Sequence, residues 1–187
     1  MQEVSGLLSA KSAGALLLGL TAMLPLGAAA GKGNPPKLPP QVQRQLMAAI
    51  KICRDAGGKP GASPEFLIVA DLTGDKIADF VIDEASLNCE GGGSANAGTA
   101  GGQLAIFVGV GKGQAAKVFE QGVLGVKVDK SISPASIKVA VGGALCGQSA
   151  SKKAAMSEMK TCWRPVQWNA SRRRMEFAPL SQIEPMK

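Results

Sequence analysis

Residues 66–82 read Phe-Leu-Ile-Val-Ala-Asp-Leu-Thr-Gly-Asp-Lys-Ile-Ala-Asp-Phe-Val-Ile, with a short apolar run on each side of a polar loop. Apolar runs rich in Ile, Val and Phe that are bounded by Gly and Asp favour β-strands. The loop carries Asp71, Asp75 and Asp79, one at every fourth position. Like charges packed this closely repel one another unless a cation neutralises them. The stretch therefore predicts two strands joined by a tight loop whose oxygens turn inward.

Calcium suits such a loop, because it takes about six to eight oxygen ligands from carboxylates, backbone carbonyls and water. Gly74 allows a sharp turn in the middle of the loop. An EF-hand is excluded, because that motif needs helices on both sides and a Glu at its twelfth position, which is Ile82 here. A plain hairpin turn is the alternative, since Asp, Gly and Thr are common turn residues. The acceptors at alternate positions predict the calcium ligands Asp71, Thr73, Asp75, Ile77 (through its carbonyl) and Asp79.

The pattern Asp-x-x-Gly-Asp-x-x-x-Asp-Phe-Val-Ile resembles the calcium loop of FG-GAP (VCBS-type) repeats, usually written D-x-N-G-D-G-x-x-D before an apolar strand. The resemblance implies side-chain ligands at Asp71, Thr73, Asp75 and Asp79. Thr73 stands where the family has Asn or Asp, and Lys76 stands where it has Gly. The chain holds one copy, so it does not predict a propeller. The broader similarity is to small secreted bacterial proteins that carry one such loop together with cysteines.

The N-terminal residues 1–30 are typical of a secretory signal, with Lys11 before an apolar run that ends in Gly-Ala-Ala-Ala. An uncleaved membrane anchor is the alternative, because the run is nearly long enough to span a bilayer. We expect a periplasmic or extracellular protein after cleavage. Residues 31–40, rich in Gly, Pro, Asn and Lys, predict a flexible linker. The expected organisation is completed by a single disulfide-stabilised domain over residues 41–180 and a C-terminal tail over 181–187.

An α+β fold is predicted, mostly an antiparallel meander with one N-terminal helix packed on it. Apolar residues with helical spacing start after Pro39-Pro40 and stop before Gly57-Gly58, and they are Val42, Leu46, Ala49, Ile50 and Cys53. The Gly-rich residues 91–102 predict a flexible loop. Short β-prone runs separated by turn residues predict strands at 66–70, 80–82, 104–110, 116–120, 122–128, 136–141, 161–168 and 174–177.

Four well-separated cysteines predict two disulfides in an exported protein. Zinc is a weaker alternative, because the sequence has no Cys-x-x-Cys pair and no histidine. Four cysteines allow three pairings. Proximity in the sequence suggests Cys53–Cys89 and Cys146–Cys162.

Charge is segregated along this chain of net charge +7. Residues 65–99 are acidic, and the basic residues are densest at Lys152, Lys153, Lys160, Arg164 and Arg172–Arg174. Export and the scarcity of aromatic residues argue against nucleic acid. Anionic envelope lipids or acidic glycans are the expected partners of the basic surface. A solvated basic face that binds nothing is the alternative.

The absence of histidine excludes Ser-His-Asp and Cys-His nucleophiles, and no other catalytic pattern stands out. We expect a non-enzymatic binding or structural module with a structural calcium loop. The second hypothesis is an exported hydrolase that uses two carboxylates, for which Asp79, Asp83 and Glu84 are the crowded candidates. The third is a metal-free envelope structural or inhibitor-like protein.

Overall fold

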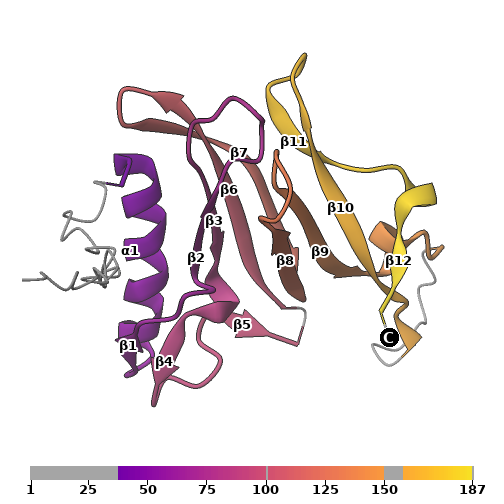
Figure 1. Cartoon of the computed structure of the whole chain (residues 1–187). Helices are drawn as coiled ribbons and strands as arrows, with labels where there is room; N and C mark the ends of the chain where they lie inside the picture. The colour runs from indigo at the N-terminus through magenta and orange to yellow at the C-terminus, as the bar shows by residue number, and fades with distance from the viewer. Residues whose placement is uncertain (1–37, 100, 150–157, 187) are drawn as a thin grey trace, which may run out of the picture. The chain divides into compact units, whose positions relative to one another are not determined.

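The computed structural model describes residues 38–99, 101–149 and 158–186, which belong to one compact unit, residues 36–187 (Figure 1). The predicted secretory signal, residues 31–37 of the predicted linker, and Lys152 and Lys153 lie outside the described residues. Within the described residues, no helix has the length and apolar character needed to span a membrane.

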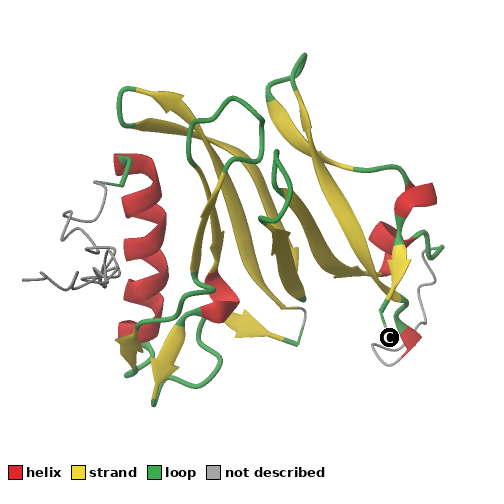
Figure 2. Cartoon of the chain, in the orientation of Figure 1, coloured by secondary structure: helices red, strands yellow, loops and turns green. Residues whose placement is uncertain are grey.

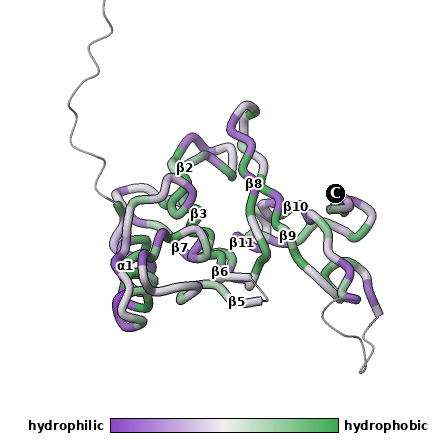
Figure 3. Tube along the Cα trace, turned by 90° about the horizontal axis from the view of Figure 1, so that it is seen from below, coloured by the Kyte–Doolittle hydropathy of each residue, from purple (hydrophilic) through white to green (hydrophobic). Residues whose placement is uncertain are grey.

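Helix α1 (Pro40–Asp55) is the predicted helix, with Pro40 at its first position, where a missing N–H does no harm. Gly57, at a φ of 78°, follows its end. Hydrophilic and hydrophobic colours alternate along α1 in Figure 3, as expected for a helix with one apolar face. That face packs on the core through all five predicted positions. Val42, Ala49 and Cys53 are fully buried, and Leu46 and Ile50 pack against them.

The first sheet contains the strands that flank the aspartate loop. Its strand order is β2-β3-β6-β5, and β7 pairs with β6. Every pairing is antiparallel, and β2 meets β3 in register from Leu67 opposite Ile82 to Ala70 opposite Asp79. The strands are β2 (Leu67–Ala70), β3 (Asp79–Asp83), β5 (Ala97–Gly98), β6 (Gly101–Gly111) and β7 (Gln114–Val123).

The second sheet has the order β11-β10-β9-β8, and β12 also pairs with β10. A separate two-stranded ladder joins β1 to β4. Three short 3₁₀ turns, η1 (Glu84–Ser86), η2 (Gly143–Cys146) and η4 (Leu180–Gln182), complete the described elements. The remaining strands are β8 (Gly125–Asp129), β9 (Ser136–Gly142), β10 (Thr161–Asn169), β11 (Arg174–Phe177), β12 (Glu184–Pro185), β1 (Lys59–Gly61) and β4 (Asn88–Glu90).

Two apolar clusters form on the two faces of the first sheet, because successive side chains of a strand point to opposite faces. On β3, Phe80 and Ile82 pack with the residues of α1, whereas Val81 packs with those of β9 and β10. The first sheet is therefore the middle layer, with the helix on one side and the second sheet on the other (Figure 2).

The α+β class is confirmed, and so is a strand at each predicted position. Strands β1, β4, β5 and β12 lie outside the strands that the sequence predicts. The expected loop at residues 91–102 contains β5 and the start of β6. The expected tail differs too, because Ile183 packs on the core and Glu184 pairs with Trp163 of β10. Strands β1, β4, β5 and β12 are only two or three residues long, so their sequences show no apolar alternation that would predict them.

Both suggested disulfides are confirmed. Cys53 and Cys89 join the last turn of α1 to β4, and their Cα atoms are 5.7 Å apart. Cys146 and Cys162 join η2 to β10, with Cα atoms 5.8 Å apart. No free cysteine is left in the chain.

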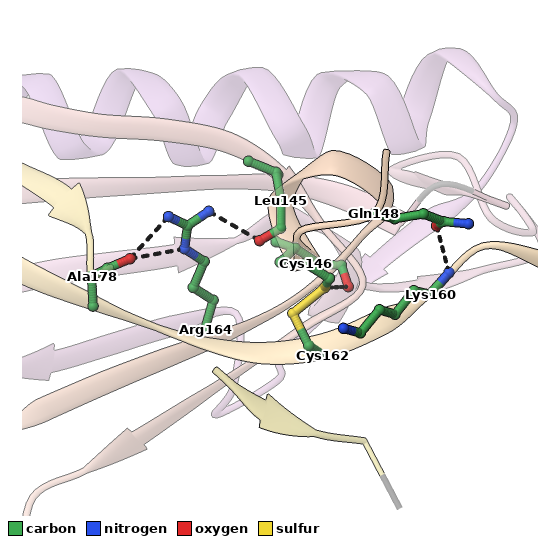
Figure 4. Close-up of a disulfide and its surroundings, with 8 residues drawn as sticks. Leu145, Cys146, Gln148, Lys160, Cys162, Arg164 and Ala178 are labelled. Carbon is green, nitrogen blue, oxygen red and sulfur yellow. Dashed lines mark hydrogen bonds between the residues drawn. A yellow bond between two sulfur atoms is a disulfide. The ribbon is translucent and has the colours of Figure 1, made fainter. Parts of the chain in front are cut away.

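Arg164 does not belong to a basic surface as expected, because it lies on the core-facing side of β10. Its guanidinium donates to the carbonyl oxygens of Ala178 and Leu145 (Figure 4). The same group lies 4.7 Å from the ring centre of Phe177. Burial lowers the pKa of Arg164. The side chain thus ties β10 to two neighbouring segments, beside the disulfide between Cys146 and Cys162.

The Glu176 carboxylate holds the turn of the β10–β11 hairpin, and its hydrogen bonds should make the stability of this turn depend on pH. The Asn169 amide donates to Glu176 Oε2 over 2.8 Å, and Arg174 and Arg172 donate to Oε1. These partners lower the pKa of Glu176 from 4.5 to about 2, with Asn169 contributing most. A depressed folded-state pKa contributes stability above the unfolded value, which is lost as the pH falls towards 2.

We therefore expect an NMR titration of the Glu176 side chain to give a midpoint near 2, well below 4.5. Asn169→Ala should move the midpoint upward, because it removes the largest cause of the shift. The protection of the hairpin amides, measured as exchange relative to the intrinsic rate at each pH, should fall over the same acid range. A midpoint near 4.5 in the unmodified protein would contradict the network.

Candidate functional site: the aspartate loop and the pocket beside it

The aspartate loop, residues 71–79, connects β2 and β3 and contacts the connection between β8 and β9. Leu72 is 4% exposed and belongs to the core between the sheets. The Asp71 carbonyl accepts a 2.8 Å hydrogen bond from the Ala135 N–H of the β8–β9 connection. The loop is therefore tied to the second sheet by its backbone as well as by apolar contact.

Asp71 uses its whole carboxylate to hold the turn. Oδ1 accepts from the N–H groups of Thr73 and Gly74 at 3.2 and 2.7 Å, and Oδ2 accepts from that of Lys76 at 2.9 Å. Burial alone would raise the pKa of Asp71, but these hydrogen bonds to Gly74, Lys76 and Thr73 outweigh it and lower the pKa. Lys76 has a φ of 66°, so a lysine adopts a left-handed backbone where the FG-GAP pattern has glycine.

Asp79 is fully buried and also uses both oxygens. Oδ2 accepts from the Leu72 N–H at 2.8 Å, and Oδ1 accepts from the Gly109 N–H of β6 at 2.9 Å. Burial raises the pKa of Asp79, and the negative charges of Asp75 and Asp71 add to the effect. A Cβ at Gly109 would lie 2.5 Å from the Ala78 carbonyl oxygen, so only glycine permits the loop to approach β6 this closely.

Asp75 is the loop carboxylate with the fewest backbone contacts. Its Oδ1 accepts a 2.8 Å bond from the Ile77 N–H, and its side chain is exposed. Thr73 bonds weakly to Asp71 through its hydroxyl, 3.5 Å away, and Ile77 is 37% exposed. Asp71 and Asp79 thus use both carboxylate oxygens to hold backbone N–H groups, whereas Asp75 uses one and is exposed.

This division bears on the predicted calcium ligands. The four oxygens of Asp71 and Asp79 already accept N–H bonds, so both carboxylates have a role in holding the loop that needs no ion. Among the described residues, no group of three or more Cys, Asp or Glu side chains is placed to hold a metal. Calcium binding by the loop stays a prediction, and so does the FG-GAP resemblance.

The three carboxylates that the hydrolase hypothesis would use are buried. Asp79, Asp83 and Glu84 are 0%, 4% and 7% exposed. Asp83 accepts from the Ser86 hydroxyl and the Ala85 N–H, which caps η1, and Glu84 accepts from the Gln45 amide of α1. Burial raises the pKa of Asp83. Three buried, hydrogen-bonded carboxyl groups do not face each other across an open cleft, which is what that hypothesis requires.

A pocket of about 250 Å³ opens beside the loop, and we name it the loop pocket. Asp75 and Ile77 of the loop form one side, and Trp168 and Arg173 of the β10–β11 hairpin also line it. The sequence predicts Arg173 only as part of a basic surface and Trp168 only as part of a strand, because nothing in it indicates that this turn meets the aspartate loop. The remaining lining residues come from β6 and β7 and are Val108, Gly109, Val110, Ala116 and Val118.

The loop pocket brings together two opposite charges that are not paired with each other. Within the described part of the chain, neither Asp75 nor Arg173 has an ion pair, although both line the same pocket. The neighbouring Arg172 and Arg174 instead bond to Glu176. Arg173 has a φ of 51°, a left-handed conformation in the hairpin turn. The loop pocket is therefore lined by one carboxylate, one guanidinium and several apolar side chains.

Comparison with known proteins finds no family model, no curated protein and no solved structure that matches this chain.

Proposed function

We propose that the protein is an exported binding module, not an enzyme, and that its ligand site is the loop pocket. The two disulfides support export, because such bonds persist in oxidising compartments. The single observation that carries the site is that Asp75 and Arg173, neither of which has an ion pair, line the same pocket together with several apolar side chains. Small-ligand sites are typically apolar pockets with a few polar groups that fix orientation.

The charges define the ligand class as a small zwitterion, such as a free amino acid with an apolar side chain. Its ammonium group would face the free Oδ2 of Asp75, and its carboxylate would face the Arg173 guanidinium, which suits carboxylates. Its side chain would lie on Ile77, Val118 and Trp168. The proposal gives the aspartate loop a role in binding that does not depend on a metal.

The test is an isothermal titration of the oxidised protein with leucine, N-acetylleucine and leucinamide, the last two of which each lack one charge. A hydrogen bond to a charged group is worth about 1.5–3 kcal/mol, so each derivative should bind at least about tenfold more weakly than leucine. Asp75→Asn should abolish the preference for leucine over N-acetylleucine. Arg173→Gln should abolish the preference for leucine over leucinamide.

Arg172→Gln is the matched control, because Arg172 lies next to Arg173 but bonds to Glu176. It should leave all three affinities unchanged. The proposal is wrong if leucine does not bind at millimolar concentration, or if the three compounds bind equally well.

A further inference from the structure

A second pocket, of about 610 Å³, lies on the other side of the first sheet, between the end of α1 and the segment that follows it. We name it the helix pocket. Its most buried lining residues are Phe66 and Leu87, which are 8% and 7% exposed and belong to the cluster beneath α1. Its volume lies within the range of about 300–1,000 Å³ that is usual for small-ligand sites.

The lining of the helix pocket is apolar and held in place. Pro60 and Pro64 contribute walls whose backbone φ is fixed by the proline ring. Pro60 lies opposite Cys89 in the β1–β4 ladder, and Cys89 is bonded to Cys53 of α1. The disulfide therefore fastens both sides of the pocket together. A preformed pocket loses little conformational entropy when it binds a ligand.

One charged side chain lines this pocket, and it is a cation. Arg54 lies one helical turn after Ile50, and both belong to the lining. Within the described residues Arg54 has no ion pair, whereas the nearby Lys51 and Asp55 pair with each other. The carbonyls at the end of a helix carry partial negative charge, so an anion here must be held by the guanidinium itself.

The apolar surface continues beyond the pocket along α1. Met47 lies one turn before Ile50 and is 54% exposed. An elongated apolar ligand would cover both residues and end at Arg54. A compact polar ligand would leave Met47 and Ile50 uncovered. An apolar ligand without a charged group would leave Arg54 without a partner.

We infer that the helix pocket binds the free carboxylate of a fatty acid, with the chain on Phe66, Leu87 and Ile50 and the carboxylate on Arg54. This site is separate from the loop pocket and does not depend on the function proposed there. It also gives a specific form to the expectation of anionic lipid partners, because it rests on one arginine and one pocket instead of a broad basic surface.

The experiment is a titration of the oxidised protein with dodecanoate, below the concentration at which this probe aggregates, followed by calorimetry and amide NMR. We expect saturable binding of one molecule, with the largest NMR shifts at Phe66 and Leu87. Arg54→Gln should weaken dodecanoate binding at least tenfold. Dodecanol, which has the same chain without the charge, should bind more weakly than dodecanoate and should not respond to Arg54→Gln.

Two further variants separate this site from general attraction to a protein of net charge +7. Arg44 is an exposed arginine of the same helix, but it lines a different pocket, so Arg44→Gln should leave dodecanoate binding unchanged. Ala62→Phe adds a ring at an exposed lining position and should block the chain. The inference is overturned if dodecanoate does not saturate, if Arg54→Gln binds as well as the unmodified protein, or if Arg44→Gln weakens binding equally.

Discussion

Asp79→Ala is expected to lower the free energy of unfolding by about 3–5 kcal/mol. The substitution removes the acceptor for the N–H groups of Leu72 and Gly109 in a fully buried position. A buried donor left without a partner costs about 1–3 kcal/mol, and two are created here. The loop would also lose its attachment to β6, next to the core residue Leu72. Urea unfolding of the oxidised protein, followed by tryptophan fluorescence, measures the effect.

Asp75→Ala is the matched control, because it removes a carboxylate from the same loop at an exposed position with one backbone hydrogen bond. It should cost about 0.5–1.5 kcal/mol, the usual net value of one hydrogen bond. If the two variants lose similar stability, Asp79 does not hold the loop as described.

The same unfolding curves, recorded with calcium and with excess chelator, test the predicted calcium site. A ligand that binds only the folded state stabilises it by about 2.7 kcal/mol at a hundred times its dissociation constant. A higher free energy of unfolding in the presence of calcium would confirm the site, provided that Asp75→Ala abolishes the increase. Identical curves at millimolar calcium would mean that hydrogen bonds alone order the loop.

Removal of the disulfide between Cys53 and Cys89 is the second large effect. The bond closes a loop with a sequence separation of 36 residues, for which chain entropy gives about 4 kcal/mol. Its loss also frees the end of α1 from β4. We expect the double variant Cys53→Ala/Cys89→Ala to lose about this amount in urea unfolding.

The other disulfide supplies the comparison, because Cys146 and Cys162 are separated by only 16 residues. The same chain-entropy relation gives about 3 kcal/mol for Cys146→Ala/Cys162→Ala. If loss of the disulfide that closes the longer loop lowers the free energy of unfolding by less than loss of the other disulfide, strain in the folded state outweighs chain entropy. A loss below 1 kcal/mol for Cys53→Ala/Cys89→Ala would contradict the prediction outright.

The sequence predicts the strands well where apolar runs are bounded by strong turn residues. Residues 66–82 are the clearest case, because the loop carboxylates and Gly74 mark the turn between β2 and β3. It predicts β1, β4 and β5 poorly, since their pairing depends on contacts that their own Gly, Pro and polar residues do not indicate. Helix α1 is predicted closely because both its ends carry Pro or Gly signals.

The site is less accessible to sequence reasoning, because carboxylates that look equivalent in the pattern do different things. Asp71, Asp75 and Asp79 have the same spacing, yet the direction of each carboxylate depends on which backbone N–H groups are near it. Arg164 shows the same limit, since a basic residue in a strand can face the core when carbonyl oxygens meet it there. The loop pocket depends on the packing of two sheets.

The pairing of β12 with β10 has a consequence for self-association. A sheet border with free N–H and C=O groups can recruit a strand from another molecule. Here Pro185 stands opposite Cys162 at that border, and proline has no N–H to offer to an incoming chain. Residues Glu184 and Pro185 therefore protect this part of the β10 edge against pairing with a strand of another molecule.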